Sequence, residues 1–438
     1  MRVSFYTLGC KVNQNETAAL ERLFLRQGYT LAKDGEADVY VVNSCTVTAE
    51  GDKKSRQWLR RAKRKNPGAV TVLAGCYPQA FPEKAAALAE ADVVVGNVGR
   101  AALLQDIQKA LESGERVVDI RPHEKGERFE ELFTADTGLR APDAGPGGHT
   151  RAFVKVQDGC DRRCAYCVIP RARGASRSRA EASVLEELAA LAAAGYKEVV
   201  LTGINLPGYG KDTGTDLVSL IEAAAAVEGI ERIRLGSLEP DLLDDGSIAR
   251  MAAVKELCPQ FHLSLQSGCT ATLRRMRRVY TAEEYALVVE KLRAAYGGAA
   301  SFTTDVIVGF PGESEAEFAE SLAFVRARRF LKVHVFPYSR RAGTPAADFP
   351  GQLTEAEKAD RVHRMQRAAD QVRDDLAQEM VGGEETVLLE QRLSGNLLTG
   401  YTRLYLPTVV KGRGLAPGQA VRVRLVGWDG ENAWAEVL

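Results

Sequence analysis

Three apolar, strand-like segments of this chain each end at a cysteine, and this repetition constrains the fold more than any other feature. The segments are "VSFYTLGC", "VYVVNSC" and "VTVLAGC", and they end at Cys10, Cys45 and Cys76. The cysteines lie 35 and 31 residues apart, which leaves room for a helix between successive strands. Strand–helix–strand units of this length predict a parallel α/β sheet. Because parallel strands end at the same edge of a sheet, we expect the three thiols to lie side by side.

The composition is that of an ordinary globular protein with room for two or three domains. The chain has 438 residues, of which 45% are hydrophobic and 26% charged. We find no apolar run long enough to cross a membrane and no signal peptide, so we expect a cytoplasmic protein without membrane contact. Cytosolic thiols stay reduced, and clustered cysteines there indicate metal binding or catalysis. The 58 basic and 58 acidic residues balance, so net charge predicts no nucleic-acid partner.

Alternating strand and helix patterns divide the chain into three domains. Residues 1–115 predict an N-terminal parallel α/β domain, and the polar residues 116–150, which include the flexible joint "GPGGH", predict a linker. Residues 151–381 contain six strand–helix units and end in a long helix. This predicts a partial (β/α)6 barrel, short of the eight units that close a full one. Short β-like runs with glycine turns over residues 382–438 predict a small all-β barrel.

The first cysteine set indicates a shared metal site. Soft thiolates that meet at one place select iron–sulfur clusters, zinc or copper(I). Any one of these cysteines alone could be a small buried hydrophobic residue. Three of them in equivalent positions favour the metal site.

A second cysteine set follows the first strand of the second domain. The segment "DGCDRRCAYCVIP" contains Cys160, Cys164 and Cys167 in a C-x3-C-x2-C spacing. Three thiolates on one loop can hold three irons of a 4Fe–4S cluster and leave the fourth iron open to a ligand. A structural zinc ion is the alternative, but it needs a fourth ligand, and no histidine or further cysteine lies nearby in the sequence.

With Tyr166 before its last cysteine, this loop resembles the motif of the radical S-adenosylmethionine (SAM) superfamily. The later segments "LTGIN", "LGSLEP", "LSLQSG" and "TDVIVGFPGE" resemble its SAM-binding strands. Two cysteine triads and a C-terminal β-barrel make the whole chain similar to the radical-SAM methylthiotransferases, which end in a TRAM domain. The segments "TLGCKVNQNET" and "VQDGCDRRCAYCVIPRARG" resemble the branch that acts on threonylcarbamoyladenosine at tRNA position 37. Two residues depart from the expected pattern, since Arg171 replaces an aromatic residue and Arg277 an asparagine.

The resemblance implies two 4Fe–4S clusters and SAM as cofactors, with a one-electron donor such as a flavodoxin or ferredoxin as a partner. The triad at 160–167 would hold the cluster that cleaves SAM to a radical, which takes a hydrogen atom from C2 of the adenine. The triad of Cys10, Cys45 and Cys76 would hold an auxiliary cluster that carries the sulfur. Tyr166 would lie against the SAM adenine. The further candidate SAM contacts are Gly203, Ser237, Glu239 and Gln266.

Local runs of basic residues predict contact with the anticodon loop of tRNA. Residues 53–65 contain eight basic residues, residues 162–179 six arginines, and residues 274–278 four, with no acidic residue in any run. Such runs can neutralise phosphates, while splayed loop bases can enter a pocket. For 53–65 a solvated helix face is an equal alternative.

Other substrates and roles remain open at this point. Isopentenyladenosine in tRNA or a ribosomal-protein aspartate could be the group modified, and a non-catalytic iron–sulfur or zinc RNA-binding protein is a less favoured class. Cys258 and Cys269 are predicted to be packing residues. The five histidines form no H-x-x-x-H pair and predict no metal site.

Overall fold

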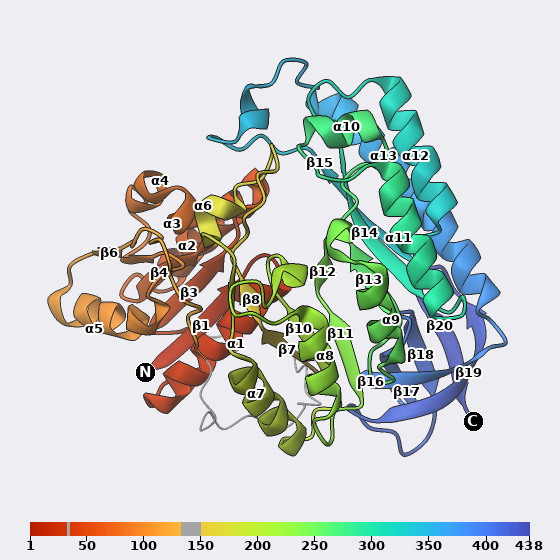
Figure 1. Ribbon diagram of the computed structural model, residues 1–438. Coiled ribbons are helices and arrows are strands. Elements are labelled where there is room, and N and C mark those ends of the chain that lie inside the picture. Colours follow the sequence, from red (N-terminus) through yellow and green to blue (C-terminus); the bar gives the residue numbers. More distant parts are fainter. Residues whose placement is uncertain (33–35, 133–149) are drawn as a thin grey trace.

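The computed structural model describes residues 1–32, 36–132 and 150–438. Most of the second half of the predicted linker, including "GPGGH", lies outside these described residues. Figure 1 shows an N-terminal α/β domain, a curved array of strands with helices on its outer side, and a small β-barrel that contains the C-terminus. The predicted fold class, with two parallel α/β parts and an all-β barrel, is confirmed.

The N-terminal domain is built on a parallel sheet with the strand order β2-β1-β3-β4-β5-β6. Strands β3 and β4 are buried along their whole length, which explains why both read as continuous apolar runs. The strands that precede the three cysteines are neighbours in this sheet, as the sequence predicts. The elements are β1 (Arg2–Thr7), α1 (Lys11–Arg26), β2 (Thr30–Leu31), β3 (Val39–Ser44), α2 (Ala49–Lys65), β4 (Val70–Gly75), α3 (Cys76–Ala80), α4 (Pro82–Ala86), β5 (Val93–Val95), η1 (Arg100–Ala102), α5 (Leu103–Ser113) and β6 (Val117–Asp119).

The central domain consists of two parallel sheets, β11-β10-β7 and β12-β13-β14-β15, joined by a bridge between Ile233 and Leu257. The segment "RIRLGS" is interrupted at Gly236 and divided between the two sheets. The strands are β7 (Arg151–Lys155), β8 (Gln157–Asp158), β9 (Arg177–Ser178), β10 (Glu198–Thr202), β11 (Arg232–Leu235), β12 (Ser237–Leu238), β13 (Gln260–Leu263), β14 (Ser301–Val308) and β15 (Lys332–Pro337).

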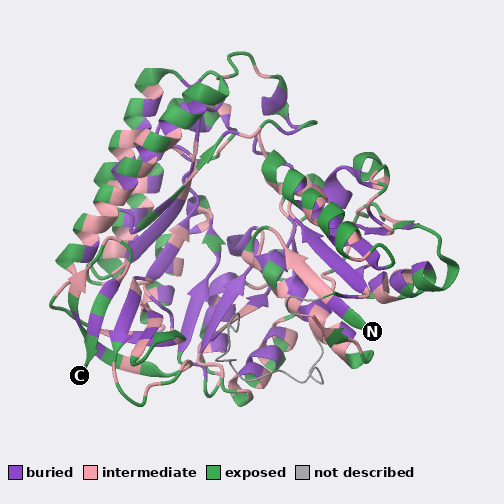
Figure 2. Cartoon of the chain, turned by 180° about the vertical axis from the view of Figure 1, so that it is seen from behind, coloured by how far each residue is buried: buried purple, intermediate pink, exposed green. Residues whose placement is uncertain are grey.

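Helices cover the outer side of these strands, so that one side of the curved sheets carries the core and the other faces inward. Figure 2 shows buried strands and helices that expose their outer surfaces. Capping boxes start α11, α12 and α13, which fixes where each helix begins. The helices are α6 (Ile169–Arg173), α7 (Glu181–Ala193), η2 (Leu206–Gly208), α8 (Leu217–Ala225), η3 (Pro240–Leu242), α9 (Asp245–Ala253), α10 (Thr270–Arg275), α11 (Ala282–Ala295), α12 (Glu315–Arg328), η4 (Pro345–Asp348) and α13 (Glu355–Glu379).

The C-terminal domain is a closed barrel with the strand order β16-β17-β18-β20-β19. Its strands are β16 (Glu384–Ser394), β17 (Leu397–Thr402), β18 (Pro407–Lys411), β19 (Ala420–Trp428) and β20 (Ala433–Val437). Arg232 and Arg234 of β11 donate hydrogen bonds to its backbone, to Thr386 O at 2.6 Å and Thr402 O at 2.7 Å. These bonds fix the barrel against the central domain. None of the described helices is long and apolar enough to cross a membrane.

Candidate active site

The first cysteine triad lies at the carboxyl edge of the N-terminal sheet. Cys10 precedes α1, Cys45 follows β3, and Cys76 is the first residue of α3. Cys10 Sγ and Cys76 Sγ lie 3.8 and 4.0 Å from the same atom, Asn13 Oδ1. A Cβ atom at Gly9 would lie 2.8 Å from Cys45 Cβ, so a glycine there lets the first loop approach the second. The three cysteines therefore lie close together at this edge of the sheet, as the sequence predicted.

Arg173 connects this triad to the central domain. The side chain is buried at the end of α6, and its Nε donates a hydrogen bond to Cys76 Sγ at 3.3 Å. Its Nη2 donates to Asn13 Oδ1 at 2.6 Å and to Glu16 Oε2 at 2.9 Å. Asn97 Nδ2 also donates to the Cys76 sulfur, at 3.5 Å. The Cys76 sulfur thus accepts hydrogen bonds from two N–H donors, one from each domain.

Buried charges around Glu16 join the two domains. Lys155 Nζ lies 2.8 Å from Glu16 Oε1 and 2.5 Å from Asp158 Oδ2, and Arg100 also pairs with Glu16. Burial by itself raises the pKa of Glu16, but Arg100, Arg173 and Lys155 outweigh it and hold that pKa well below its ordinary value. For Asp158 the cost of burial is likewise exceeded by Lys155 and Arg173, which lower its pKa to about 2. Both carboxyl groups are therefore ionised, as buried and paired acids can be.

The second cysteine triad lies on the loop between β8 and α6. Arg162 N donates to Cys160 Sγ at 3.4 Å, and Arg278 Nη1 donates to Cys164 Sγ at 3.1 Å. Arg278 also pairs with Glu239, one of the predicted SAM contacts. Burial raises the pKa of Glu239, although Arg278 opposes that shift. Sequence analysis missed this role of Arg278, because the residue lies within the basic run 274–278 that was assigned to RNA.

Both triads fit iron–sulfur clusters better than single metal ions. Among the described residues, only His262, Asp305 and His334 bring three possible metal-binding atoms within 4.8 Å of one another. A tetrahedral zinc ion, with Zn–S bonds of about 2.3 Å, would hold its sulfur ligands about 3.8 Å apart. In neither triad do all three sulfurs lie within 4.8 Å of one another, which is wider than one zinc ion would hold them and leaves room for a larger cluster.

The thiols of Cys45, Cys160 and Cys167 are also poor nucleophiles in the absence of a cation. Burial is the main cause that raises the pKa values of these three, and neighbouring thiols add to it. The pKa rises to about 12 for Cys45, about 11 for Cys160 and about 12 for Cys167. A bound metal removes the thiol proton, so the arrangement favours metal ligation over covalent catalysis.

The remaining predicted site residues are Tyr166, Gly203, Ser237 and Gln266. The Tyr166 ring packs edge-on against Phe310, with ring centroids 6.4 Å apart. A Cβ atom at Gly203 would lie 2.7 Å from Gln157 Oε1, so only glycine fits there. Gln266 has a φ of +70°, a conformation that non-glycine residues adopt mainly where the surroundings enforce it. Ser237 lines the pocket described next. Contact of these residues with SAM stays a prediction.

A pocket of about 560 Å³ lies where the three domains meet. Its wall includes Cys10 and Lys11 from the N-terminal domain, Ser237 from the central domain, and Tyr401 and Tyr405 from the C-terminal barrel. The volume is within the range of pockets that bind small organic groups. One cysteine of the first triad and two predicted SAM contacts, Gly203 and Ser237, thus open into the same space.

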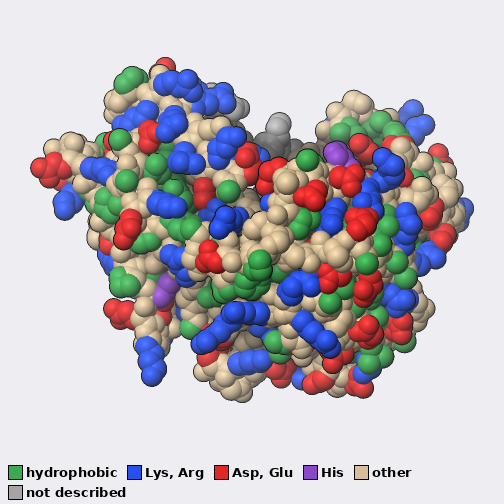
Figure 3. Space-filling model, turned by 90° about the horizontal axis from the view of Figure 1, so that it is seen from above, with side chains coloured by type: hydrophobic (Ala, Val, Ile, Leu, Met, Phe, Trp, Pro, Cys, Tyr) green, Lys and Arg blue, Asp and Glu red, His purple; other side chains and the backbone are tan. Residues whose placement is uncertain are grey.

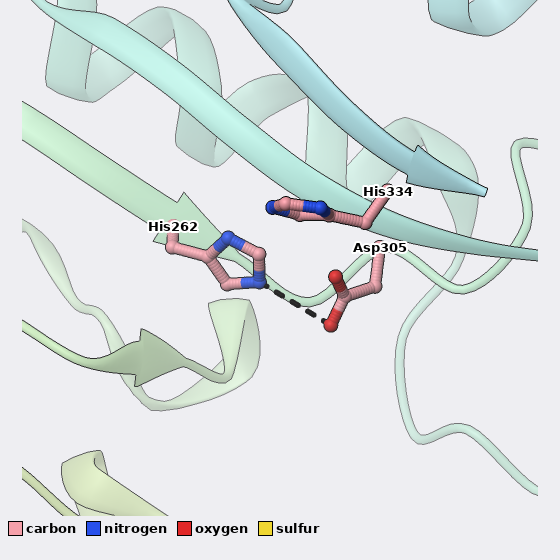
Figure 4. A group of neighbouring side chains, drawn as sticks. All are labelled: His262, Asp305 and His334. Atoms are coloured by element: carbon pink, nitrogen blue, oxygen red, sulfur yellow. Dashed lines mark ion pairs between the residues drawn. The ribbon is translucent and has the colours of Figure 1, made fainter. Parts of the chain in front are cut away.

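Two of the five histidines meet in this pocket, although the sequence contains no H-x-x-x-H pair. His262 and His334 lie with Asp305 on three adjacent strands, as Figure 4 shows. This cluster could not be seen in the sequence, because the three residues are far apart along the chain and become neighbours only through the parallel pairing of β13, β14 and β15.

The basic runs divide into buried and exposed residues. Within 162–179, Arg173, Arg177 and Arg179 are buried, so half of that run serves internal ion pairs and cannot reach RNA. The run at 53–65 lies on α2 and exposes many of its basic side chains, among them Lys54 and Arg61. Figure 3, which views the molecule from above, shows many Lys and Arg side chains on this surface, mixed with acidic ones. Cys258 and Cys269 are buried, as predicted for packing residues.

Comparison with protein families supports this reading of the two α/β parts. The radical SAM superfamily matches residues 154–325, and the uncharacterized protein family UPF0004 matches residues 2–96. The computed fold is similar to a radical S-adenosylmethionine methyltransferase from Kitasatospora setae, solved with cobalamin and a [4Fe-4S] cluster. That likeness has a TM-score of 0.55 and 15% identity, and it covers 91% of this chain and 77% of the other. At this identity the likeness concerns the fold alone.

Relatives of similar length define the family more closely. The chain is 41% identical to the threonylcarbamoyladenosine tRNA methylthiotransferase MtaB of Bacillus subtilis (strain 168), over 97% of this chain and 93% of the relative. It is 35% identical to the enzyme of the same name from Thermotoga maritima, over 98% and 95%. It is 34% identical to a tRNA-2-methylthio-N(6)-dimethylallyladenosine synthase from Pelotomaculum thermopropionicum, over 96% and 94%. The chain therefore belongs to the radical-SAM methylthiotransferase family.

Proposed function

We propose that this protein methylthiolates C2 of N6-threonylcarbamoyladenosine at position 37 of tRNA. The observation that carries the proposal is the pocket at the meeting point of the three domains, into which Cys10, Gly203 and Ser237 all open. A base held there contacts both the auxiliary site and the SAM-binding strands. The high similarity to relatives named for this activity supports the choice of substrate.

The cofactors supply the reactive groups, and the chain supplies position. When bound, two 4Fe–4S clusters and SAM provide the electron, the radical and the sulfur that methylthiolation requires. Cys160, Cys164 and Cys167 hold one cluster and Cys10, Cys45 and Cys76 the other. Arg278 and Arg173 each donate a hydrogen bond to a ligand sulfur, which stabilises its negative charge. The barrel interior excludes water from the reacting groups.

The protein surface binds the anticodon loop of tRNA. Exposed cations of α2, such as Lys54 and Arg61, contact phosphates beside the first triad. The target base leaves the stack of the loop and enters the pocket. A one-electron donor such as a flavodoxin or ferredoxin reduces the protein, which acts in the cytoplasm without membrane contact.

Nucleoside analysis tests the proposed substrate. Anaerobically reconstituted protein is incubated with SAM, a reductant, sulfide and one of three tRNAs, which carry threonylcarbamoyladenosine, isopentenyladenosine or unmodified adenosine at position 37. The RNA is then digested, and the nucleosides are weighed by mass spectrometry. Of the three tRNAs, we expect the one with threonylcarbamoyladenosine to show the earliest methylthio mass gain. A gain on isopentenyladenosine alone would reject the substrate, and SAM cleavage without any gain would point to a protein substrate.

A further inference from the structure

The pocket has a polar wall for which neither the cysteine triads nor the SAM strands account. Lys11 enters it from the first turn of α1, His262 and Asp305 from β13 and β14, and Tyr405 from the C-terminal barrel. Each of the three domains thus contributes a polar side chain. A surface assembled from three domains at one point indicates a binding site for a polar group.

His262 and Asp305 form an oriented pair. His262 Nε2 lies 3.4 Å from Asp305 Oδ2, while His262 Nδ1 lies 3.0 Å from Thr303 Oγ1. The parallel register places His262 opposite Thr303, and Asp305 opposite His334. Figure 4 shows the His262–Asp305 pair below the ring of His334. The carboxylate of Asp305 therefore lies beside two imidazoles and can still accept a hydrogen bond from a ligand.

Lys11 supplies a positive charge without a fixed partner. Among the described residues none forms an ion pair or hydrogen bond with its ammonium group, although Asp305 and Tyr405 lie near enough to interact with it electrostatically. Lys332 adds a second ammonium group to the pocket wall, whereas Arg373 is paired with Asp370 and Asp374. An ammonium group without a fixed partner in a concave site attracts an anion.

Tyr405 closes one side of this wall in a strained conformation. Its φ is +68°, and its ring stacks on Tyr401 with centroids 4.6 Å apart. Arg151 and Arg234 lie over the same ring, at 5.2 and 5.1 Å from its centroid. Backbone strain of this kind persists where contacts impose it and occurs preferentially at ligand sites.

The two imidazoles and one carboxylate could also be the ligands of a divalent cation. The ammonium group of Lys11 acts against this, because it already lies in the field of Asp305 and would repel a second cation. His262 further directs one ring nitrogen at Asp305 and the other at Thr303. An organic anion that carries its own hydrogen-bond donor matches the wall better than a metal ion.

We propose that this wall is the subsite for the threonylcarbamoyl substituent, in which Lys11 pairs with the carboxylate and Asp305, held by His262, accepts a hydrogen bond from the hydroxyl group. The inference rests on the proposed function and names the residues that select the substrate. The threonyl group carries one carboxylate and one hydroxyl, which match one cation and one acceptor. An isopentenyl group has neither and would leave the Lys11 ammonium group desolvated without an anion and Asp305 with His262 as its partner but no ligand hydroxyl to accept from, which is a basis for rejection.

Binding of three anticodon stem-loop RNAs tests the subsite. They carry adenosine, threonylcarbamoyladenosine or the methyl ester of threonylcarbamoyladenosine at position 37, and their dissociation constants are measured by fluorescence anisotropy with reconstituted protein. We expect the wild-type protein to bind the acid about 10- to 100-fold more tightly than the ester, the range for one charge-assisted hydrogen bond. Lys11→Met should bind acid and ester equally. Lys109→Met, which removes an exposed lysine on α5, should retain the wild-type ratio.

Asp305→Asn provides a second variant, because Lys11 adjoins Cys10 and its loss could disturb the metal site. This variant should bind the acid more weakly, with iron and sulfide content unchanged. An acid-to-ester ratio in Lys11→Met equal to that of the wild type would overturn the ion pair. A wild-type preference that disappears with EDTA would assign the wall to a divalent cation instead, and would also overturn it. Failure of the wild-type protein to methylthiolate the acid-bearing RNA would reject the proposed function separately.

Discussion

Replacement of Arg173 by methionine should loosen the contact between the N-terminal and central domains. The guanidinium group is buried and donates to Glu16, Asn13 and Cys76 across that contact. Removal of one partner of a buried ion pair costs about 3–5 kcal/mol. Glu16 keeps Arg100 and Lys155 as partners, so we expect the lower value, about 3 kcal/mol.

Hydrogen exchange measures this loss where it occurs. A cost of about 3 kcal/mol corresponds to exchange that is about 100-fold faster for amides at the contact. A reporter beside the contact is the amide of Cys160, which donates at 3.0 Å to the carbonyl oxygen of Gly174, the residue that follows Arg173. The control is Arg250→Met, which removes an exposed arginine paired with Asp216 and Glu222 and should leave these rates unchanged. Exchange in Arg173→Met within threefold of the wild-type rate would refute the assigned role of the buried pair.

Three further predictions concern single positions. Gly75→Ala should lower the iron content from about eight to about four atoms per chain, because the new Cβ atom would lie 2.6 Å from Asn43 Oδ1, next to Cys76. The control is Gly28→Ala, at a glycine whose φ is also positive but which has open space around it, and this variant should keep all its iron. Arg277→Asn should stabilise the protein by up to about 1 kcal/mol in thermal unfolding, because asparagine tolerates the φ of +57° better than arginine, whereas Arg274→Asn should not. The lowered pKa values of Glu16 and Asp158 stabilise the domain contact above the ordinary carboxyl pKa of about 4. The protection of amides at the contact, which is the exchange rate relative to the intrinsic rate at the same pH, should therefore be constant from pH 8 to 5 and fall below pH 4; a loss of protection already at pH 6 would contradict this.

The sequence predicted those features that depend on local pattern. To predict that Cys10, Cys45 and Cys76 lie together, we needed only the apolar pattern of each strand and the rule that parallel strands end at the same edge of a sheet. The Cys160–Cys167 loop is contiguous, so its spacing was visible directly. For the same reason the predictions of a (β/α)6 arrangement and of a C-terminal β-barrel agree with the structure.

Features that depend on long-range pairing could not be predicted in this way. Arg173 and Arg278 were counted as surface cations, because a charged run gives no sign that one of its members turns inward to a sulfur atom. His262 and His334 are 72 positions apart and meet only because β14 lies between their strands. The signal that could have found them is alternation within β13 and β15, where polar residues occupy the inward positions of otherwise apolar strands.

The central claim is that the two cysteine triads hold separate clusters with separate tasks. The most direct test measures 5′-deoxyadenosine and methylthiolated nucleoside in the same reaction of Cys76→Ala with threonylcarbamoyladenosine-bearing tRNA. The account predicts that this variant still cleaves SAM but forms no methylthio product, whereas Cys164→Ala does neither. Methylthio product from Cys76→Ala at the wild-type yield would contradict the account.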